Sequence, residues 1–236
     1  MTDAARDVLV VFARCPAAGR VKTRLARAIG DAAAASLYAA FVADLRDRFA
    51  HAPFAVRWAL APPDDGFAAR FAVDPSHVFL QSGEDLGARM RDAFARMLAA
   101  GFARCAIIGS DMPQLAPRVV EDALARLGSA DLVLGPAQDG GYYLIAARAV
   151  PEVFDGIAWG TDSVLASTLE RARARNLATS LLEPGFDVDV EADLERLRAL
   201  LAMPEAAAAL PATAAALAAL DEKPQNSITT SGSSST

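Results

Sequence analysis

The sequence is poor in the residues from which many metal and nucleophile sites are built. Its 236 residues include two histidines and two cysteines, and the histidines, His51 and His77, lie far apart. A zinc site needs several such ligands together, and a catalytic triad needs a histidine with partners. The composition therefore argues against a His-bound zinc site and against His-based acid/base catalysis. Carboxylates, arginine, lysine and the backbone remain as the groups that can carry chemistry.

Long apolar runs are also absent. The first run, Val8 to Ala13, is interrupted by Arg14 and Pro16, so it is too short for a secretory signal or for a membrane span of about 18 residues. Two cysteines without a vicinal partner make no disulfide framework, which favours a reducing compartment. We therefore expect a cytoplasmic protein with no membrane partner. A net charge of −6 with a single short basic loop likewise predicts no nucleic-acid partner.

Short apolar segments alternate with longer segments of helical period. This order is typical of an α/β domain with a largely parallel sheet. The expected strands are 8–13, 56–61, 77–81, 105–109, 132–134, 142–146 and 178–182. The expected helices are 31–49, 85–100, 118–127, 162–175 and 191–201, and a further helix follows the first loop. Thr161 is a candidate cap for the helix that starts at 162, and Pro117 suits a first helical turn.

The carboxyl-terminal part changes character. We expect residues 1–220 to form one domain, with the alanine-rich segment 204–220 as a surface helix. Residues 221–236 are rich in Ser and Thr with almost no apolar side chain, which predicts a disordered tail.

The first expected strand runs into a basic loop. From Val8 to Gly30 there is no acidic residue, and five cations follow one another: Arg14, Arg20, Lys22, Arg24 and Arg27. A basic loop between a strand and a helix joins side-chain charge to the positive end of the helix dipole, which predicts a phosphate site. The loop matches neither a Walker A motif nor G-x-G-x-x-G.

The alternative is that these cations are solvated residues on an exposed turn. We favour Lys22 and Arg24 as ligands and treat Arg20 and Arg27 as surface charge. Lys22 stands out because the chain has 21 arginines and two lysines, and the other lysine, Lys223, falls in the expected tail.

Two acidic segments follow expected strands. Asp111 comes directly after the strand that ends at Gly109, at the edge where open α/β sheets bind ligands. It could equally cap the turn that Pro113 enforces. Asp187 and Asp189 alternate along the chain and so point to the same side, and Mg²⁺ is commonly held by one or two carboxylates plus substrate phosphates. The alternative for Asp189 is an N-cap of the helix that begins at Glu191.

Two glycine-containing segments complete the candidates. Asp139-Gly140-Gly141 lies between two expected strands, where paired glycines permit close approach of a ligand but also suit an ordinary hairpin. Asp139 is the candidate acceptor-side carboxylate. Trp159 precedes Gly160 and could pack against a sugar or a base, although a buried tryptophan is the more frequent case.

Taken together these motifs resemble the glycosyltransferase A-type nucleotide-diphospho-sugar transferase superfamily. More closely, they are similar to the bacterial family called radical-SAM/selenodomain-associated transferase 1, which is linked to arsenosugar biosynthesis. The matching segments are 16–25, 81–90, 109–113, 139–143, 159–162 and 187–189. They span nearly all of the expected folded chain, and their order and spacing carry the resemblance.

The resemblance implies a three-layer α/β/α sandwich with a mixed, mostly parallel, Rossmann-like sheet. It also implies a nucleotide or nucleotide-sugar donor, a small-molecule acceptor, and Mg²⁺ (or Mn²⁺) held by Asp111 and Asp189. The implied nucleotide-binding residues are Arg14, Gly19, Lys22, Arg24, Gln81 and Asp111, the catalytic residues are Lys22, Arg24, Asp111 and Asp139, and the acceptor-side residues are Gly140, Gly141 and Trp159.

The sequence departs from the Asp-x-Asp pattern of many such glycosyltransferases, because Gly109 stands two residues before Asp111 and Pro113 two residues after it. Glycosyl transfer therefore stands beside nucleotidyl transfer, since the basic loop and the Asp-Val-Asp segment also resemble those of guanylyltransferases. A family member that only binds nucleotide is the third reading.

Overall fold

A computed structural model describes residues 6–64 and 66–222. Within that part of the chain the strands form one seven-stranded sheet in the order β3-β2-β1-β4-β6-β5-β7. Only β6 runs antiparallel to its neighbours, β4 and β5. The strands are β1 (Asp7–Arg14), β2 (Ala55–Ala61), β3 (Val78–Leu80), β4 (Arg104–Gly109), β5 (Leu132–Pro136), β6 (Tyr142–Ala147) and β7 (Thr179–Leu181).

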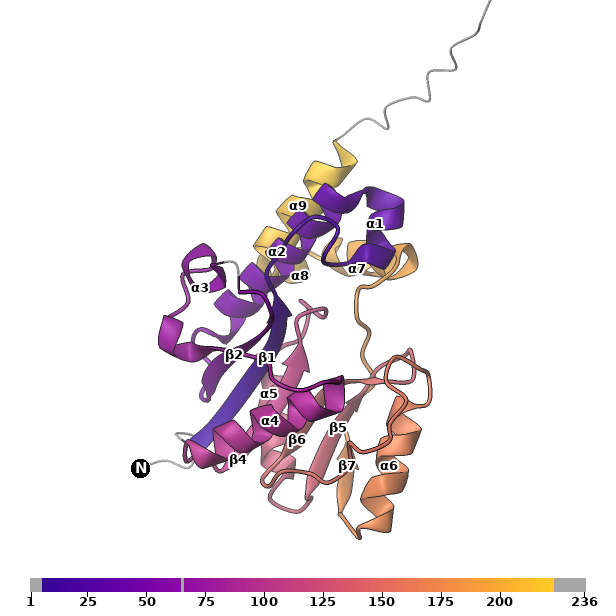
Figure 1. The fold of residues 1–236 in the computed structure, drawn as a ribbon. Helices are drawn as coiled ribbons and strands as arrows, with labels where there is room; N and C mark the ends of the chain where they lie inside the picture. The colour runs from indigo at the N-terminus through magenta and orange to yellow at the C-terminus, as the bar shows by residue number, and fades with distance from the viewer. Residues whose placement is uncertain (1–5, 65, 223–236) are drawn as a thin grey trace, which may run out of the picture.

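Helices cover both faces of this sheet, so the architecture is a three-layer α/β/α sandwich (Figure 1). The helices are α1 (Thr23–Ile29), α2 (Asp31–Phe49), α3 (Phe67–Arg70), the short 3-10 helix η2 (Pro75–His77), α4 (Leu86–Ala99), α5 (Pro117–Arg126), α6 (Val164–Ala174), α7 (Glu191–Leu201), α8 (Pro204–Ala209) and α9 (Pro211–Asp221).

The alternation of β1 side chains divides the core between the two faces. Leu9 and Val11 pack with residues of α1, α2, α5, α7 and α9, whereas Val8 and Val10 pack with residues of α4 and α6. In Figure 1, α4 crosses the sheet in front of β1 and β4, and α7 to α9 lie beside α1 and α2. The predicted α/β fold with a mixed, mostly parallel sheet is confirmed.

Three local predictions need correction. The segment 204–220 is not one helix, because Pro211 cannot continue the hydrogen-bond ladder of α8 and instead starts α9. Thr161 does not cap α6: the residue before the helix is Ser163, and the Thr161 hydroxyl donates to the Ala158 carbonyl at 2.8 Å. Asp221, expected in the tail, is the last residue of α9, while residues 223–236 lie outside the described part of the chain.

The carboxyl-terminal helix is fixed to the body by a buried acid. Asp44 of α2 is 1% exposed, and its two carboxylate oxygens accept hydrogen bonds from the backbone amides of Ala212 and Thr213 at 3.0 and 2.7 Å. These amides belong to the first turn of α9, where intrahelical partners are missing. Asp44 therefore caps a helix that is distant in sequence, and α9 packs along α2.

The topology creates the position for a ligand between β1 and β4. From β1 the strand order proceeds to β2 and β3 on one side and to β4 on the other, which makes the boundary between β1 and β4 a switch point. The two strands pair in parallel, with Phe12 opposite Gly109. Their carboxyl ends, Arg14 and the segment that begins at Ser110, therefore lie side by side.

Candidate active site

Lys22 occupies a constrained position at the start of α1. It is the N-cap residue of that helix and has left-handed backbone angles, φ 49° and ψ 40°, which are uncommon outside glycine. Its side chain is 3% exposed, although lysine is rarely buried without a partner. The basic loop thus does not leave this lysine in solvent, and the alternative of an exposed turn fails for Lys22.

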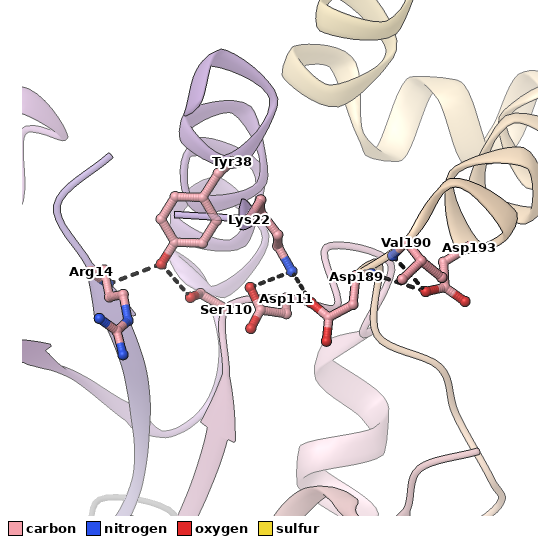
Figure 2. A network of polar contacts seen from close by, with 8 residues as sticks. All are labelled: Arg14, Lys22, Tyr38, Ser110, Asp111, Asp189, Val190 and Asp193. Atoms are coloured by element: carbon pink, nitrogen blue, oxygen red, sulfur yellow. Dashed lines mark hydrogen bonds and ion pairs between the residues drawn. The ribbon is translucent and has the colours of Figure 1, made fainter. Parts of the chain in front are cut away.

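The buried ammonium of Lys22 joins two carboxylates that the sequence places far apart. Its Nζ lies 2.6 Å from Oδ1 of Asp111 and 2.8 Å from Oδ1 of Asp189 (Figure 2). The ring of Phe41 lies below it, with its centroid 5.9 Å from Nζ. Burial lowers the pKa of Lys22, but the charges of Asp111 and Asp189 raise it by more, and the net direction is upward. The side chain is therefore a charged ammonium at neutral pH.

The backbone holds both carboxylates in place. The Val188 amide donates to the Asp111 carbonyl at 2.9 Å, which ties the segment after β4 to the segment before α7. Asp193 reaches back from α7, and its Oδ2 accepts from the amides of Asp189 and Val190, each at 3.0 Å. The N-cap position of α7 is Val190, whose side chain makes no capping bond, so the alternative of Asp189 as the helix cap is wrong; Asp193, inside the first turn, instead accepts from the amide of the N-cap residue.

A second polar network joins the ends of β1 and β4. The Tyr38 hydroxyl accepts from the Arg14 amide at 2.9 Å and lies 2.7 Å from Oγ of Ser110 (Figure 2). Burial, and then the charge of Asp111, raises the pKa of Tyr38 to about 12, so the phenol stays protonated. Sequence reasoning missed both Tyr38 and Ser110, because a tyrosine within an apolar helix gives no signal of its partner.

A cavity of about 530 Å³ opens at these strand ends, within the size range of small-molecule sites. It brings together five of the six predicted nucleotide-binding residues, namely Arg14, Lys22, Arg24, Gln81 and Asp111, and it is also lined by Asp189, which was predicted as a metal ligand. The Gln81 amide nitrogen is engaged by the Ala59 carbonyl at 2.8 Å. Leu86, Arg89 and Met90 of α4, which lie in the matching segment 81–90 but were given no role there, add a partly apolar wall. Gly19 lies in the loop outside this cavity and has φ 73°.

A smaller cavity of about 230 Å³ adjoins the first. Arg24 and Asp189 line both, and Asp139, Asp187 and Arg196 line the smaller one. Asp187 and Asp189 thus share the smaller cavity, and of the two Asp189 alone also lines the larger one. Burial, and then the charge of Asp111, raises the pKa of the Asp187 carboxyl to about 7. Arg196, which was missed, lies over the Phe186 ring at 4.0 Å and donates to Gln138 at 2.6 Å.

Of the residues predicted for the acceptor side, Asp139 lines the smaller cavity, whereas Gly140, Gly141 and Trp159 line neither cavity. Gly140 belongs to the hairpin between β5 and β6, and its φ of 86° and its contact with the Asp162 backbone leave no room for a side chain. The Gly141 amide donates to Asp139 at 3.0 Å within the same turn. Trp159 is half-buried against Phe154, and its ring covers Gly87.

Two carboxylates at this site are oxygen donors of the kind that Mg²⁺ uses. Among residues 6–64 and 66–222 no group of three or more metal-ligating side chains converges. Asp111 and Asp189 nevertheless converge on one point, the Lys22 ammonium. Their side chains are 42% and 39% exposed, respectively. Mg²⁺ is commonly held by one or two carboxylates with substrate phosphates completing the shell. The pair therefore fits a cation that arrives with a phosphorylated ligand.

The sheet and the site at its switch point agree with one superfamily, and the comparison with solved structures shows the same class. The seven-stranded, mostly parallel sheet, with a carboxylate pair and a basic loop at its switch point, agrees with what the resemblance to the nucleotide-diphospho-sugar transferase superfamily implies. The computed structure is similar to that of a Desulfovibrio desulfuricans G20 protein provisionally named a nucleotide-diphospho-sugar transferase. The two share 33% identity and a TM-score of 0.80 over 92% of this chain and 98% of that one.

Two more distant structures share the fold alone. One is a cytidylyltransferase from Leptospira borgpetersenii serovar Hardjo-bovis, at 12% identity and a TM-score of 0.52 over 93% of this chain and 98% of that one. The other is a CMP:2-keto-3-deoxy-manno-octonic acid synthetase in complex with CTP, at 15% identity and a TM-score of 0.51 over 84% and 99%. No curated protein sequence matches the chain.

The family model described as "Uncharacterized protein conserved in bacteria (DUF2064)" matches residues 44–161, which is 118 of 236 residues. The chain belongs to this family. Within the described residues, no helix combines the length and the apolar character that crossing a bilayer requires.

Proposed function

We propose that this protein is a Mg²⁺-dependent transferase (Mn²⁺ being the alternative ion) that takes a nucleotide-sugar donor and moves the sugar to a small acceptor. The observation that carries the proposal is the Lys22 ammonium between Asp111 and Asp189, at the wall of a 530 Å³ cavity. A diphosphate is bound by cationic side chains together with a divalent cation, and this point of the structure offers a cation and two carboxylates that could hold a metal ion. The structural similarity to the Desulfovibrio protein supports the same class.

In this proposal the larger cavity receives the donor. Lys22 and Arg24 bind the diphosphate, and Arg14 and Gln81 line the space for the nucleoside, whereas Gly19 lies outside this cavity and has no role in the proposal. Asp111 and Asp189 would hold the divalent cation, which supplies charge neutralisation of the diphosphate when bound. Preorganised charges that meet developing charge are usually the largest catalytic contribution, because they need no reorganisation during the reaction.

The smaller cavity is the place proposed for the acceptor. It shares Arg24 and Asp189 with the donor cavity, so a ligand there lies next to the donor's reacting end. Asp139 lines it and keeps one carboxylate oxygen beyond the bond that its Oδ1 accepts from Gly141. We assign Asp139 the role of accepting the proton that the acceptor hydroxyl loses. This replaces Gly140, Gly141 and Trp159 as the surface that contacts the acceptor.

Nucleotidyl transfer is the second candidate. The same cations and carboxylates could bind a nucleoside triphosphate whose α-phosphorus is attacked by a phosphorylated acceptor, with pyrophosphate leaving. The shared fold with a cytidylyltransferase and with a CTP-bound synthetase favours keeping it. A family member that binds nucleotide without turnover is the third candidate.

A thermal-shift screen tests the proposal, because a ligand that binds the native state raises its melting temperature by mass action. The panel contains nucleoside di- and triphosphates and nucleotide-sugars, each with and without Mg²⁺. We expect a Mg²⁺-dependent shift with a nucleotide-sugar, lost in Asp111→Asn and kept in Asp122→Asn, an acid in an exposed pair with Arg126. A shift with triphosphates alone favours nucleotidyl transfer. No shift with any nucleotide contradicts the proposal.

A further inference from the structure

We propose that the Lys22 ammonium is an internal substitute for the divalent cation: it neutralises Asp111 and Asp189 until a diphosphate draws it away and lets the metal ion in. The inference rests on the proposed function, because it takes the diphosphate and the metal ion as ligands of this site. It adds an order to their binding: the free protein holds the metal ion weakly, and the diphosphate and the metal ion enter together.

The geometry gives Lys22 the place of a metal ion. Its Nζ lies within 2.8 Å of one oxygen from each carboxylate, and the side chain is 3% exposed. Other ion pairs of the described residues differ from this one. Arg198 also bridges two acids, Glu195 and Asp221, but it is 30% exposed. Among the ion pairs of residues 6–64 and 66–222, Lys22 is the cation that is both shared by two carboxylates and almost fully buried.

This arrangement answers an electrostatic need. Asp111 and Asp189 converge from separate segments, and like charges so close repel each other unless a cation lies between them. Lys22 supplies that cation, and the left-handed backbone at residue 22 together with the Phe41 ring holds it there. A divalent ion at the same oxygens would meet an ammonium at short range. It can bind well only after the ammonium has moved.

The larger cavity offers the ammonium somewhere to go. Lys22 and Asp111 both line it, and a lysine stem has four flexible carbons. A diphosphate in this cavity would attract the ammonium and at the same moment supply oxygen ligands to the metal ion. Each ligand therefore strengthens the binding of the other, and couplings between two such sites are typically about 5- to 150-fold.

The first test measures Mn²⁺ binding without nucleotide, by the loss of the free-ion signal in electron paramagnetic resonance. We expect Lys22→Met to bind one Mn²⁺ at least about tenfold more tightly than the wild type. Adding Asp189→Asn to that variant is expected to abolish the gain. Arg24→Met is the control, because it removes one positive charge from the first turn of α1, at the same cavity, without freeing the carboxylates. An equal gain in Arg24→Met, or no gain in Lys22→Met, contradicts the proposal.

The second test uses the unaltered chain, so it holds even where Lys22→Met fails to fold. The sequence has two lysines, Lys22 and Lys223, so protein labelled with ¹³C at lysine Cε gives two side-chain signals. We expect Mg²⁺ alone to leave the Lys22 signal in place and Mg²⁺ with inorganic pyrophosphate to shift it. A saturable shift with Mg²⁺ alone, or no shift with both, overturns the proposal.

These results separate the two proposals. A protein that turns over a nucleotide donor but binds Mn²⁺ equally well with and without Lys22 keeps its function and loses this inference. A protein that binds no nucleotide, yet gains Mn²⁺ affinity in Lys22→Met, loses the proposed function while the substitution of ammonium for metal stands.

Discussion

Asp111→Asn separates the catalytic role of this carboxylate from its structural role. The change is nearly isosteric and removes one of the two carboxylate charges that contact the Lys22 ammonium. Breaking a fully buried ion pair costs about 3–5 kcal/mol, but Asp111 is 42% exposed and Asp189 remains. Exposure brings the expected cost down to roughly 1–2 kcal/mol of unfolding free energy. The protein therefore stays folded.

The expected loss of activity is larger. Removing one preorganised charge from the transition state lowers turnover by about 10²–10³-fold, which corresponds to roughly 3–4 kcal/mol. The assay compares kcat/KM on the donor found in the thermal-shift screen with unfolding by urea. Asp122→Asn is the matched control, because its carboxylate belongs to an exposed pair with Arg126 on α5, and we expect it to change neither quantity appreciably. Activity of Asp111→Asn within threefold of the wild type would refute the assignment.

Three further predictions concern stability and positioning. Asp44→Ala leaves the first amides of α9 without their acceptor, so we expect a loss of about 2 kcal/mol in urea unfolding and unchanged turnover per folded molecule; no loss would contradict the cap. Tyr38→Phe removes the bonds to Ser110 and from the Arg14 amide, which we expect to cost about 1 kcal/mol and to lower kcat more than it changes KM. Asp187 has a folded-state pKa of about 7, above the ordinary 3.8. Its protonated form is favoured by folding, so the wild type loses stability as pH rises from about 4 to 7. Asp187→Asn is expected to flatten that loss, by up to about 4 kcal/mol at pH 8. A parallel pH profile for the two proteins would show that this carboxyl does not titrate there.

The sequence predicts the sheet well because each strand is a short apolar run bounded by turn residues. All seven strands lie at their predicted places within a residue or two, and α2 and α7 have the predicted bounds. The helical prediction fails at 204–220. The alanine-rich composition favoured one helix, but Pro211 has no amide hydrogen to continue α8 and starts a new helix instead. The Thr161 cap fails because a hydroxyl can bond to a nearby carbonyl as readily as to a helix amide.

Individual site residues could be predicted from their local sequence, whereas contacts between residues that are distant in the sequence could not. The strand ends and the scarcity of lysine indicated Lys22, Asp111 and Asp189 one at a time. One ammonium joins both carboxylates through contacts that span 89 and 167 positions of the chain, and no local pattern encodes such contacts. Arg196 was missed for the same reason, since its place at the second cavity depends on the packing of α7 against the β5–β6 hairpin.

The central claim is that the basic loop and the two carboxylates serve transfer from a nucleotide-activated donor. Its most direct measurement is product analysis by liquid chromatography after incubation with Mg²⁺, a nucleotide-sugar that shifts the melting temperature, and candidate acceptors. We predict release of a nucleoside diphosphate by the wild type, reduced about 10²-fold or more in Asp111→Asn. Equal release by both proteins, or no nucleoside diphosphate from any donor that binds, would contradict the account.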